Sequence, residues 1–243
     1  MSAAVELRGL TRRFGSRVAV DDLTLTVEQG EILALLGQNG AGKTTTLRML
    51  SCLLRPTAGD ARLCGHSVTG APAQVKAVIN VSPQETAVAP RLSVRENLEL
   101  MARLYGADRR AARSRAAAQM ERFALTDRAG DRAGKLSGGL QRRLSIAMAL
   151  ISQPRVLFLD EPSLGMDVRA RRELWRHVEA LRGTVTVLLT THYLEEAEQL
   201  ADRVAILDEG RLRALGTAAE LKARTGLDSL EAVFLALTKE AEA

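Results

Sequence analysis

Short apolar runs, each followed at once by glycine, acidic or hydroxyl residues, divide this chain into regular segments. Runs at residues 32–36, 155–160 and 184–190 predict buried strands, because each is short and rich in aliphatic side chains. Residues 5–10 and 23–27 instead alternate apolar and polar positions, which is the period of half-buried antiparallel strands. Further short strands are predicted at residues 60–65, 78–81, 204–207 and 210–213, the last two as a hairpin.

Between the strands, apolar residues recur at helical spacing. The spacing predicts a helix over residues 93–105, which Ser93 and Glu96 begin as a capping box. A second helix, rich in alanine and arginine, is predicted at 109–123, and another at 168–182. The first two form a helical insertion, because no strand pattern separates them. Strands alternating with helices elsewhere predict an α/β fold, with a parallel, doubly wound core sheet and antiparallel strands on one side.

The segment Gly37-Gln-Asn-Gly-Ala-Gly42-Lys43-Thr44 fits the phosphate-binding loop pattern at every fixed position. It follows the strand at 32–36 and precedes apolar residues that would share one helical face: Leu47, Leu50, Leu53 and Leu54. In such a loop, backbone N–H groups and the helix N-terminus bind phosphates, Lys43 contacts the β- and γ-phosphates, and the Thr44 hydroxyl can ligate magnesium. A glycine-rich turn before a core helix is the alternative, but strand, loop and helix follow in the order that phosphate binding needs.

Asp160 and Glu161 end the strand at 155–160. In open α/β sheets, ligands bind beyond the carboxyl ends of the strands, so both carboxylates should face the same crevice as the phosphate loop. Either acid alone could belong to a charged turn. Next to a phosphate loop, the pair is better explained by chemistry.

Two other segments leave alternatives open. Phe14 precedes Gly15 in a predicted polar turn, where its ring could complete a small core or stack on adenine. Ser137, Gly138 and Gly139 lead directly into a helix, so free N–H groups there could form a second anion site. Taken by itself, so short a motif is better explained as a flexible turn.

Composition excludes several classes of protein. The chain has 46% hydrophobic and 26% charged residues, which is an ordinary globular balance. Its net charge is +5, and its arginines cluster at 103–115 and 169–176, which favours a solvated helix face near an anionic membrane. Only 3% of residues are aromatic, so no stacking platform for nucleic acid is expected. We expect no membrane span and no secretion signal, and we expect Cys52 and Cys64 to be small buried hydrophobes.

Five separated motifs, in this order and spacing, resemble those of the ATP-binding subunit of ATP-binding cassette (ABC) transporters over about residues 4–216. Residues 37–44 match the Walker A loop and residues 156–160 match Walker B. Residues 136–141 resemble the ABC signature, although Leu140 stands where many members carry Gln. Residues 163–167 resemble the D-loop, with Met166 in place of the more usual Leu.

Single positions extend the resemblance. Gln84 matches the Q-loop glutamine, Glu161 the catalytic glutamate, His192 the switch histidine and Phe14 the A-loop aromatic. The resemblance implies hydrolysis of ATP with Mg²⁺, in which Glu161 polarises the attacking water and His192 holds the γ-phosphate and the water in line. It also implies that magnesium is held, directly or through water, by Thr44, Gln84 and Asp160.

The same resemblance implies where ATP binds. Phe14 would stack on adenine, and the phosphates would lie against Gly37, Gln38, Asn39, Gly40, Ala41, Gly42, Lys43, Thr44 and Thr45. Family members pair head to tail. Ser137, Gly138 and Gly139 of one subunit are therefore expected to close over the ATP held by the other.

A narrower resemblance, to the ATPases of ABC-2 type exporters, rests on residues 93–106 and 229–238. It implies an integral membrane permease partner, a second ATP-binding subunit that is identical or related, a peripheral place on the cytoplasmic face of the membrane, and no nucleic acid partner. The expected domains are an ABC ATPase domain at 1–216, with a helical subdomain at about 90–150, and a C-terminal helical extension at 217–243.

Two other classes remain as alternatives. An ABC-type ATPase of DNA repair or translation would carry a long coiled coil or two tandem cassettes, and this sequence has neither a sustained heptad pattern nor an internal repeat. A module that holds ATP without turnover is disfavoured by the presence of both Glu161 and His192.

Overall fold

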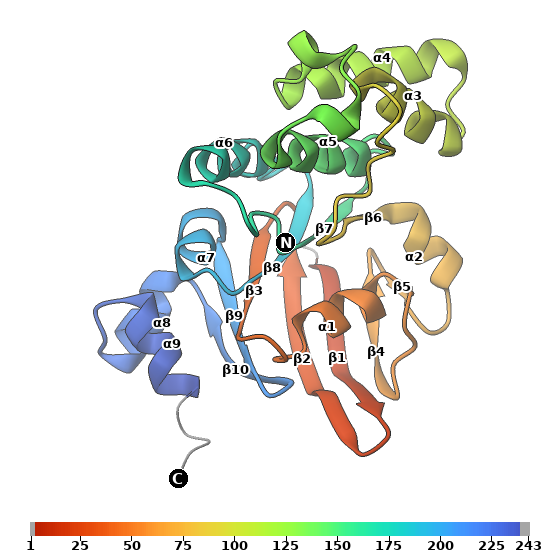
Figure 1. Cartoon of the computed structure of the whole chain (residues 1–243). Helices are drawn as coiled ribbons and strands as arrows, with labels where there is room; N and C mark the ends of the chain where they lie inside the picture. Colours follow the sequence, from red (N-terminus) through yellow and green to blue (C-terminus); the bar gives the residue numbers. More distant parts are fainter. Residues whose placement is uncertain (1–2, 239–243) are drawn as a thin grey trace.

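The computed structural model describes residues 3–238, which form two sheets surrounded by helices (Figure 1). The main sheet has the order β10-β9-β3-β8-β7-β6, in which β10 alone runs antiparallel to its neighbour. Its strands are β10 (Arg211–Gly216), β9 (Arg203–Asp208), β3 (Ile32–Leu36), β8 (Thr186–Thr191), β7 (Val156–Asp160) and β6 (Ile79–Ser82). The predicted mostly parallel core sheet is therefore confirmed.

A second, four-stranded sheet is antiparallel and has the order β2-β1-β4-β5. Its strands are β1 (Ala3–Phe14), β2 (Arg17–Glu28), β4 (Ala58–Leu63) and β5 (His66–Ser67). The alternating pattern at 5–10 and 23–27 predicted this sheet, but β1 and β2 each extend several residues further. Register shifts within their pairing accommodate the extra length.

The helices fall into groups by position (Figure 1). Those near the main sheet are α1 (Lys43–Leu50), α2 (Pro72–Val78), α5 (Gly138–Leu150), α6 (Val168–Glu179) and α7 (Leu194–Leu200). At one end of the molecule lie α3 (Val94–Leu104) and α4 (Arg109–Arg122), followed by the short 3-10 helices η1 (Thr126–Arg128) and η2 (Ala133–Lys135). The chain continues after β10 into α8 (Ala218–Thr225) and α9 (Leu230–Thr238). Within residues 3–238, none of the helices combines the length and the apolar character that crossing a membrane requires.

The main sheet is covered on both faces, which is why its strands are continuously apolar. In β3, Ile32, Ala34 and Leu36 face a core built with α3 to α7 and with the helices after β10. Leu33 and Leu35, on the opposite face, belong to a second core with α1 and the antiparallel sheet. One strand thus joins the two hydrophobic cores.

Several local predictions can be compared directly. The capping box is confirmed, since Ser93 Oγ accepts from the Glu96 N–H and the Glu96 carboxylate accepts from the Ser93 N–H. The prediction that Leu53 and Leu54 continue the face of the helix after the phosphate loop is wrong: α1 ends at Leu50, and Leu53 is 71% exposed. Residue 52 is the physical reason, because Cys52 has a φ of 55°, which breaks the helix.

The sequence patterns did not predict α2 or α7. Both are short, and α7 carries acidic residues in its first turn, so neither has a strong apolar period. The two cysteines, predicted to be small buried hydrophobes, are half-buried and free, and both have positive φ.

Candidate functional site

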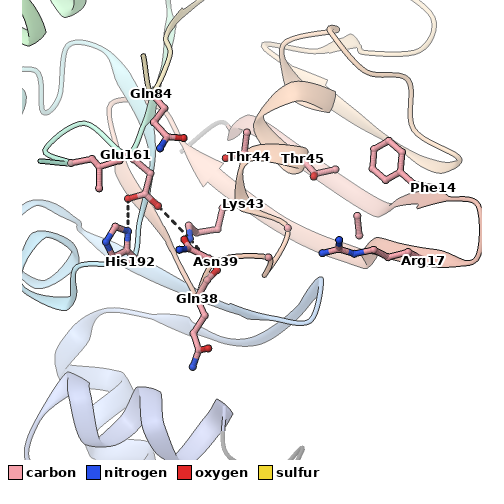
Figure 2. Close-up of a pocket in the computed structure, with 14 residues that line it drawn as sticks. Phe14, Arg17, Gln38, Asn39, Lys43, Thr44, Thr45, Gln84, Glu161 and His192 are labelled. Carbon is pink, nitrogen blue, oxygen red and sulfur yellow. Dashed lines mark hydrogen bonds and ion pairs between the residues drawn. The ribbon is translucent and has the colours of Figure 1, made fainter. Parts of the chain in front are cut away.

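A cavity of about 480 Å³ opens at the carboxyl ends of β3, β7 and β8, where the phosphate loop, Glu161 and His192 meet (Figure 2). It is lined by Phe14, Arg17, Ala19, Gln38, Asn39, Gly40, Gly42, Lys43, Thr44, Thr45, Gln84, Glu161, Leu164 and His192. Parallel strands place their carboxyl ends at one edge of a sheet, so residues distant in sequence converge here.

Glycine is required at two positions of the loop. A Cβ at Gly37 would lie 2.5 Å from the Leu207 carbonyl oxygen, and one at Gly42 would lie 2.5 Å from that of Ala19. Gly42 also has a φ of 96° and is the N-cap of α1, with no side-chain cap. The first N–H groups of α1 are therefore free of a competing side chain and can bind an anion.

Two of the phosphate-loop residues predicted to bind ATP do not line this cavity. Gly37 and Ala41 are buried residues of the loop, and the Ala41 carbonyl accepts a hydrogen bond of 3.2 Å from the Gly210 N–H. The other predicted loop residues line the cavity: Gln38, Asn39, Gly40, Gly42, Lys43, Thr44 and Thr45.

Lys43 is only 5% exposed, and its ammonium points along the loop. It donates to the carbonyl oxygens of Gly37 at 2.7 Å and Gln38 at 3.2 Å. Its Nζ also lies 3.3 Å from a carboxylate oxygen of Glu161. The buried positive charge is thus held beside the loop amides, where phosphate oxygens can reach it.

Thr44 and Asp160, two of the predicted magnesium ligands, are in contact. Thr44 Oγ1 donates to Asp160 Oδ1 at 3.1 Å, and Thr190 Oγ1 donates to the same oxygen at 2.6 Å. Gln84 lines the same cavity. Within residues 3–238, no cluster of three or more His, Cys, Asp or Glu side chains could hold a metal by itself. A hydroxyl, a carboxylate and an amide fit Mg²⁺, which takes few protein ligands and completes its shell with water and phosphate oxygens.

Glu161 lies between two partners. One carboxylate oxygen is 2.8 Å from His192 Nδ1, and the other is the oxygen that faces Lys43 (Figure 2). The Glu161 residue is 6% exposed and has a φ of 48°, an unusual conformation for a side chain of this size. Its N–H donates to both the carbonyl and the hydroxyl of Thr190, which holds the backbone in place.

Phe14 marks the other end of the cavity, well separated from Glu161 and His192 in Figure 2. The ring is not part of either core, because Phe14 is 47% exposed. The guanidinium of Arg12 lies 4.5 Å from the ring centroid. Of the two alternatives for Phe14, the small core is therefore wrong, and adenine stacking stays a prediction.

Arg17, Ala19 and Leu164 line the cavity although the sequence did not predict them. The buried Arg142, which lines the neighbouring cavity with Leu164, was not predicted either. Arg17 stands three positions after Phe14, so a basic residue beside the aromatic was an available signal. No sequence signal indicated that Arg142 is buried, because an arginine on a helix is normally solvated, also where the helix follows a glycine pair.

Ser137, Gly138 and Gly139 do not line the loop cavity. They line a separate cavity of about 370 Å³, together with the D-loop and the Q-loop residue Gln84. Ser137 is the N-cap of α5, and its Oγ accepts from the Leu140 N–H at 3.4 Å. Within one chain, the two predicted anion sites are therefore distinct.

This fold and site define a P-loop nucleotide hydrolase. A family model described as "ABC transporter" matches residues 20–164, and the chain belongs to that family. It is an ATP-binding subunit and an ATPase, and the resemblance deduced from the sequence motifs is confirmed.

Three relatives illustrate the similarity. The chain is 48% identical to daunorubicin resistance ATP-binding protein DrrA3 of Streptomyces coeruleorubidus, over 95% of this chain and 73% of that protein. It is 46% identical to doxorubicin resistance ATP-binding protein DrrA of Mycobacterium tuberculosis, over 92% of this chain and 68% of that protein. It is 41% identical to Nod factor export ATP-binding protein I of Burkholderia orbicola, over 94% of this chain and 76% of that protein.

Solved structures agree on the fold. A structure of the ATP-binding subunit of an ABC transporter matches with a TM-score of 0.85 and 28% identity, over 96% of this chain and 99% of that chain. CbiO1 of Clostridium perfringens, described as part of the ABC transporter complex CbiONQ, matches with a TM-score of 0.85 over 93% and 92%. At 22% identity, the second supports the fold alone.

Proposed function

We propose that this chain energises a membrane exporter of the ABC-2 type by binding ATP between two paired subunits and hydrolysing it. The names of its relatives support export, since two are drug-resistance ATP-binding proteins and one is a Nod factor export protein. The observation that carries the catalytic part is the position of Glu161, whose carboxylate contacts both Lys43 and His192 beside the phosphate loop.

The order of residues along the cavity supports one orientation of ATP. Phe14 lies at one end, Lys43 in the middle, and Glu161 with His192 at the other end (Figure 2). Adenine stacks on Phe14, the triphosphate lies along the loop amides from Gln38 to Thr45, and the γ-phosphate reaches Glu161.

In the proposed reaction, Glu161 takes a proton from a water molecule whose oxygen attacks the γ-phosphorus. The bond from that phosphorus to the oxygen bridging to the β-phosphate breaks, and ADP leaves with the bridging oxygen and its electron pair. Lys43 is 3.3 Å from Glu161, so a γ-phosphate would compete for its charge and free the carboxylate to act on water. His192 holds Glu161 and the γ-phosphate in line.

Mg²⁺ would neutralise charge on the β- and γ-phosphate oxygens. Thr44 and Asp160 offer the nearest oxygen donors, with Gln84 reaching the same cavity. Ser137, Gly138 and Gly139 complete the site of a second subunit, which is either a copy of this chain or a relative. Their position supports this assignment, since they line a cavity beside the loop cavity of their own chain and not that cavity itself.

Transport requires further partners. An integral membrane permease docks on the segment between Gln84 and Tyr105, and the chain works as a peripheral subunit on the cytoplasmic face of the membrane, without nucleic acid. The ATPase domain spans residues 1–216, with a helical subdomain at about 90–150, and residues 217–243 form the C-terminal extension. Exposed arginines on α3 and α4 support a place near an anionic membrane: Arg103, Arg109, Arg110 and Arg113.

The test is Glu161→Gln. It should lower ATP turnover at least about 100-fold while leaving ATP binding and ATP-dependent pairing intact, because the amide keeps the shape but cannot accept the proton. Lys43→Ala should instead weaken nucleotide binding. Its control is Lys76→Ala, which removes an exposed lysine and should leave nucleotide binding unchanged. Near wild-type turnover in Glu161→Gln would show that another group is the base.

A further inference from the structure

Arg142 is a buried cation in the second turn of α5, and it is 5% exposed. Its guanidinium donates to backbone carbonyls alone. Nε donates to Pro162 at 2.7 Å, and Nη2 donates to Asp160 and Glu161, both at 2.7 Å. Nη1 donates to Pro83 and, at 3.2 Å, to Gln84.

These five carbonyls come from two segments that leave the main sheet at neighbouring strand ends. Pro83 and Gln84 follow β6, while Asp160 is the last residue of β7 and Glu161 and Pro162 follow it. At these points the ladder hydrogen bonds stop, so the carbonyls need other donors. The fork of one guanidinium supplies donors to both segments at once.

Burying the charge of Arg142 costs free energy, which argues for a specific role of this residue. Burial lowers the pKa of Arg142, and the carboxylates of Glu196, Asp160 and Glu161 offset this only at a distance. No salt bridge within residues 3–238 includes Arg142. A buried charge bound by backbone alone fixes the geometry of that backbone, because every donor is oriented by the same planar group.

The backbone that Arg142 fixes includes that of Glu161, the proposed base. Glu161 has its N–H held by Thr190 and its carbonyl held by Arg142, so its left-handed backbone is fixed from both sides. The Gln84 carbonyl binds the same guanidinium. The proposed base and the Q-loop residue therefore share one anchor.

That anchor lies on the helix that Ser137 caps, five residues further along the chain. Helix α5 thus bears, on one rigid element, the candidate contact to a partner's ATP and the anchor of this chain's own base. We propose that Arg142 is a positioning residue that holds Glu161 and Gln84 in their working arrangement and couples them to movement of α5. This inference rests on the proposed function, because it assigns Glu161 its catalytic role.

Arg142→Lys and Arg142→Gln test the proposal. Lysine keeps the charge but cannot serve five carbonyls in one plane, and glutamine keeps a planar donor of two N–H groups. Both should bind ATP within about twofold of wild type and lower kcat by roughly 10- to 100-fold, since small misplacement of a catalytic group has this cost. Arg122→Gln is the matched control: Arg122 also donates to a backbone carbonyl, that of Ala180 at 3.3 Å, but lies outside the site.

A second comparison separates positioning from general damage. In the Glu161→Gln background, adding Arg142→Lys should cause little further loss of turnover, because the group that Arg142 positions is already inactive. Equal fold losses in both backgrounds would overturn the proposal, as would wild-type kcat in both single variants. Parallel loss of ATP binding, or failure of both variants to fold, would also overturn it by assigning Arg142 to stability.

The outcome for the proposed function is separate. If wild type hydrolyses ATP and Glu161→Gln does not, the catalytic assignment stands whatever Arg142 does. If Glu161→Gln is active, the catalytic assignment fails first.

Discussion

His192 Nδ1 lies 2.8 Å from a carboxylate oxygen of Glu161, although 31 positions separate the two residues in sequence. The contact joins the end of β8 to the end of β7, two neighbouring parallel strands. Because the other carboxylate oxygen faces Lys43, His192 is the group that fixes the second side of the proposed base.

His192→Ala should therefore lower kcat for ATP by roughly 100-fold with a small change in KM, because Glu161 and the γ-phosphate lose their common partner. Steady-state ATPase assays measure both constants. His66→Ala is the control, since His66 lies in β5 of the antiparallel sheet. A rise in KM with unchanged kcat would show that His192 binds nucleotide without aligning the reaction.

Gly138→Asp tests whether the signature segment acts on a second subunit. A Cβ at Gly138 meets nothing within 4 Å, and an acidic residue in the first turn of α5 is compatible with the helix dipole. The variant should fold and bind ATP normally, yet lose ATP-dependent pairing and at least about 90% of turnover, because its charge opposes the partner's phosphates.

Light scattering with and without ATP measures the pairing of this variant. Gly130→Asp is the control, since Gly130 is also exposed and a Cβ there also meets nothing within 4 Å. Normal pairing of Gly138→Asp would mean that this segment does not contact the partner's nucleotide.

Charge reversal at Arg95 or Arg103 tests the proposed docking of the permease. Beside Arg103 lies a groove of about 430 Å³ with two exposed leucines, Leu100 at 44% and Leu104 at 71%. Arg95→Glu and Arg103→Glu should impair transport several-fold more than the ATPase of the isolated chain, since both lie outside the nucleotide cavity. Transport and ATPase activity are measured for each variant, and Arg224→Glu, which changes another exposed arginine, is the control. Equal loss of both activities would contradict a docking role.

Glu196 gives a pH-dependent prediction. The residue is 0% exposed, Trp175 Nε1 donates to one of its oxygens at 3.0 Å, and burial raises its pKa above the ordinary 4.5. Hydrogen bonds to the carboxylate lower the pKa, while the charge of nearby Glu161 raises it further. A raised folded-state pKa means that the folded chain holds the proton more tightly than the unfolded chain.

The stability contributed by this proton is present below the ordinary pKa and is lost as pH rises through the raised value. Glu196→Gln keeps an acceptor for Trp175 without a titrating group. As pH rises above the ordinary pKa of 4.5, wild type should therefore lose stability relative to Glu196→Gln in urea unfolding. A stability difference that is constant with pH would show that Glu196 has the same pKa in both states.

Much of this fold was predictable from local pattern. The apolar run at β3 reflects burial on both faces, and the alternation in β1 and β2 reflects burial on one, so periodicity identified both sheets. The capping box of α3 is likewise local chemistry. Where a single backbone position ended an apolar pattern, as Cys52 ends the helix before Leu53, the pattern alone gave the wrong boundary.

By itself, the sequence determined the phosphate loop, the acidic pair at the end of β7 and the family to which they belong. These depend on residue type and spacing within short segments. The tertiary structure decided that His192 and Lys43 contact the two oxygens of Glu161, that Ser137 lies in a different cavity, and that Arg142 binds two segments at once. These relationships arise from strands and helices that are adjacent in space but distant along the chain, so no local pattern contains them.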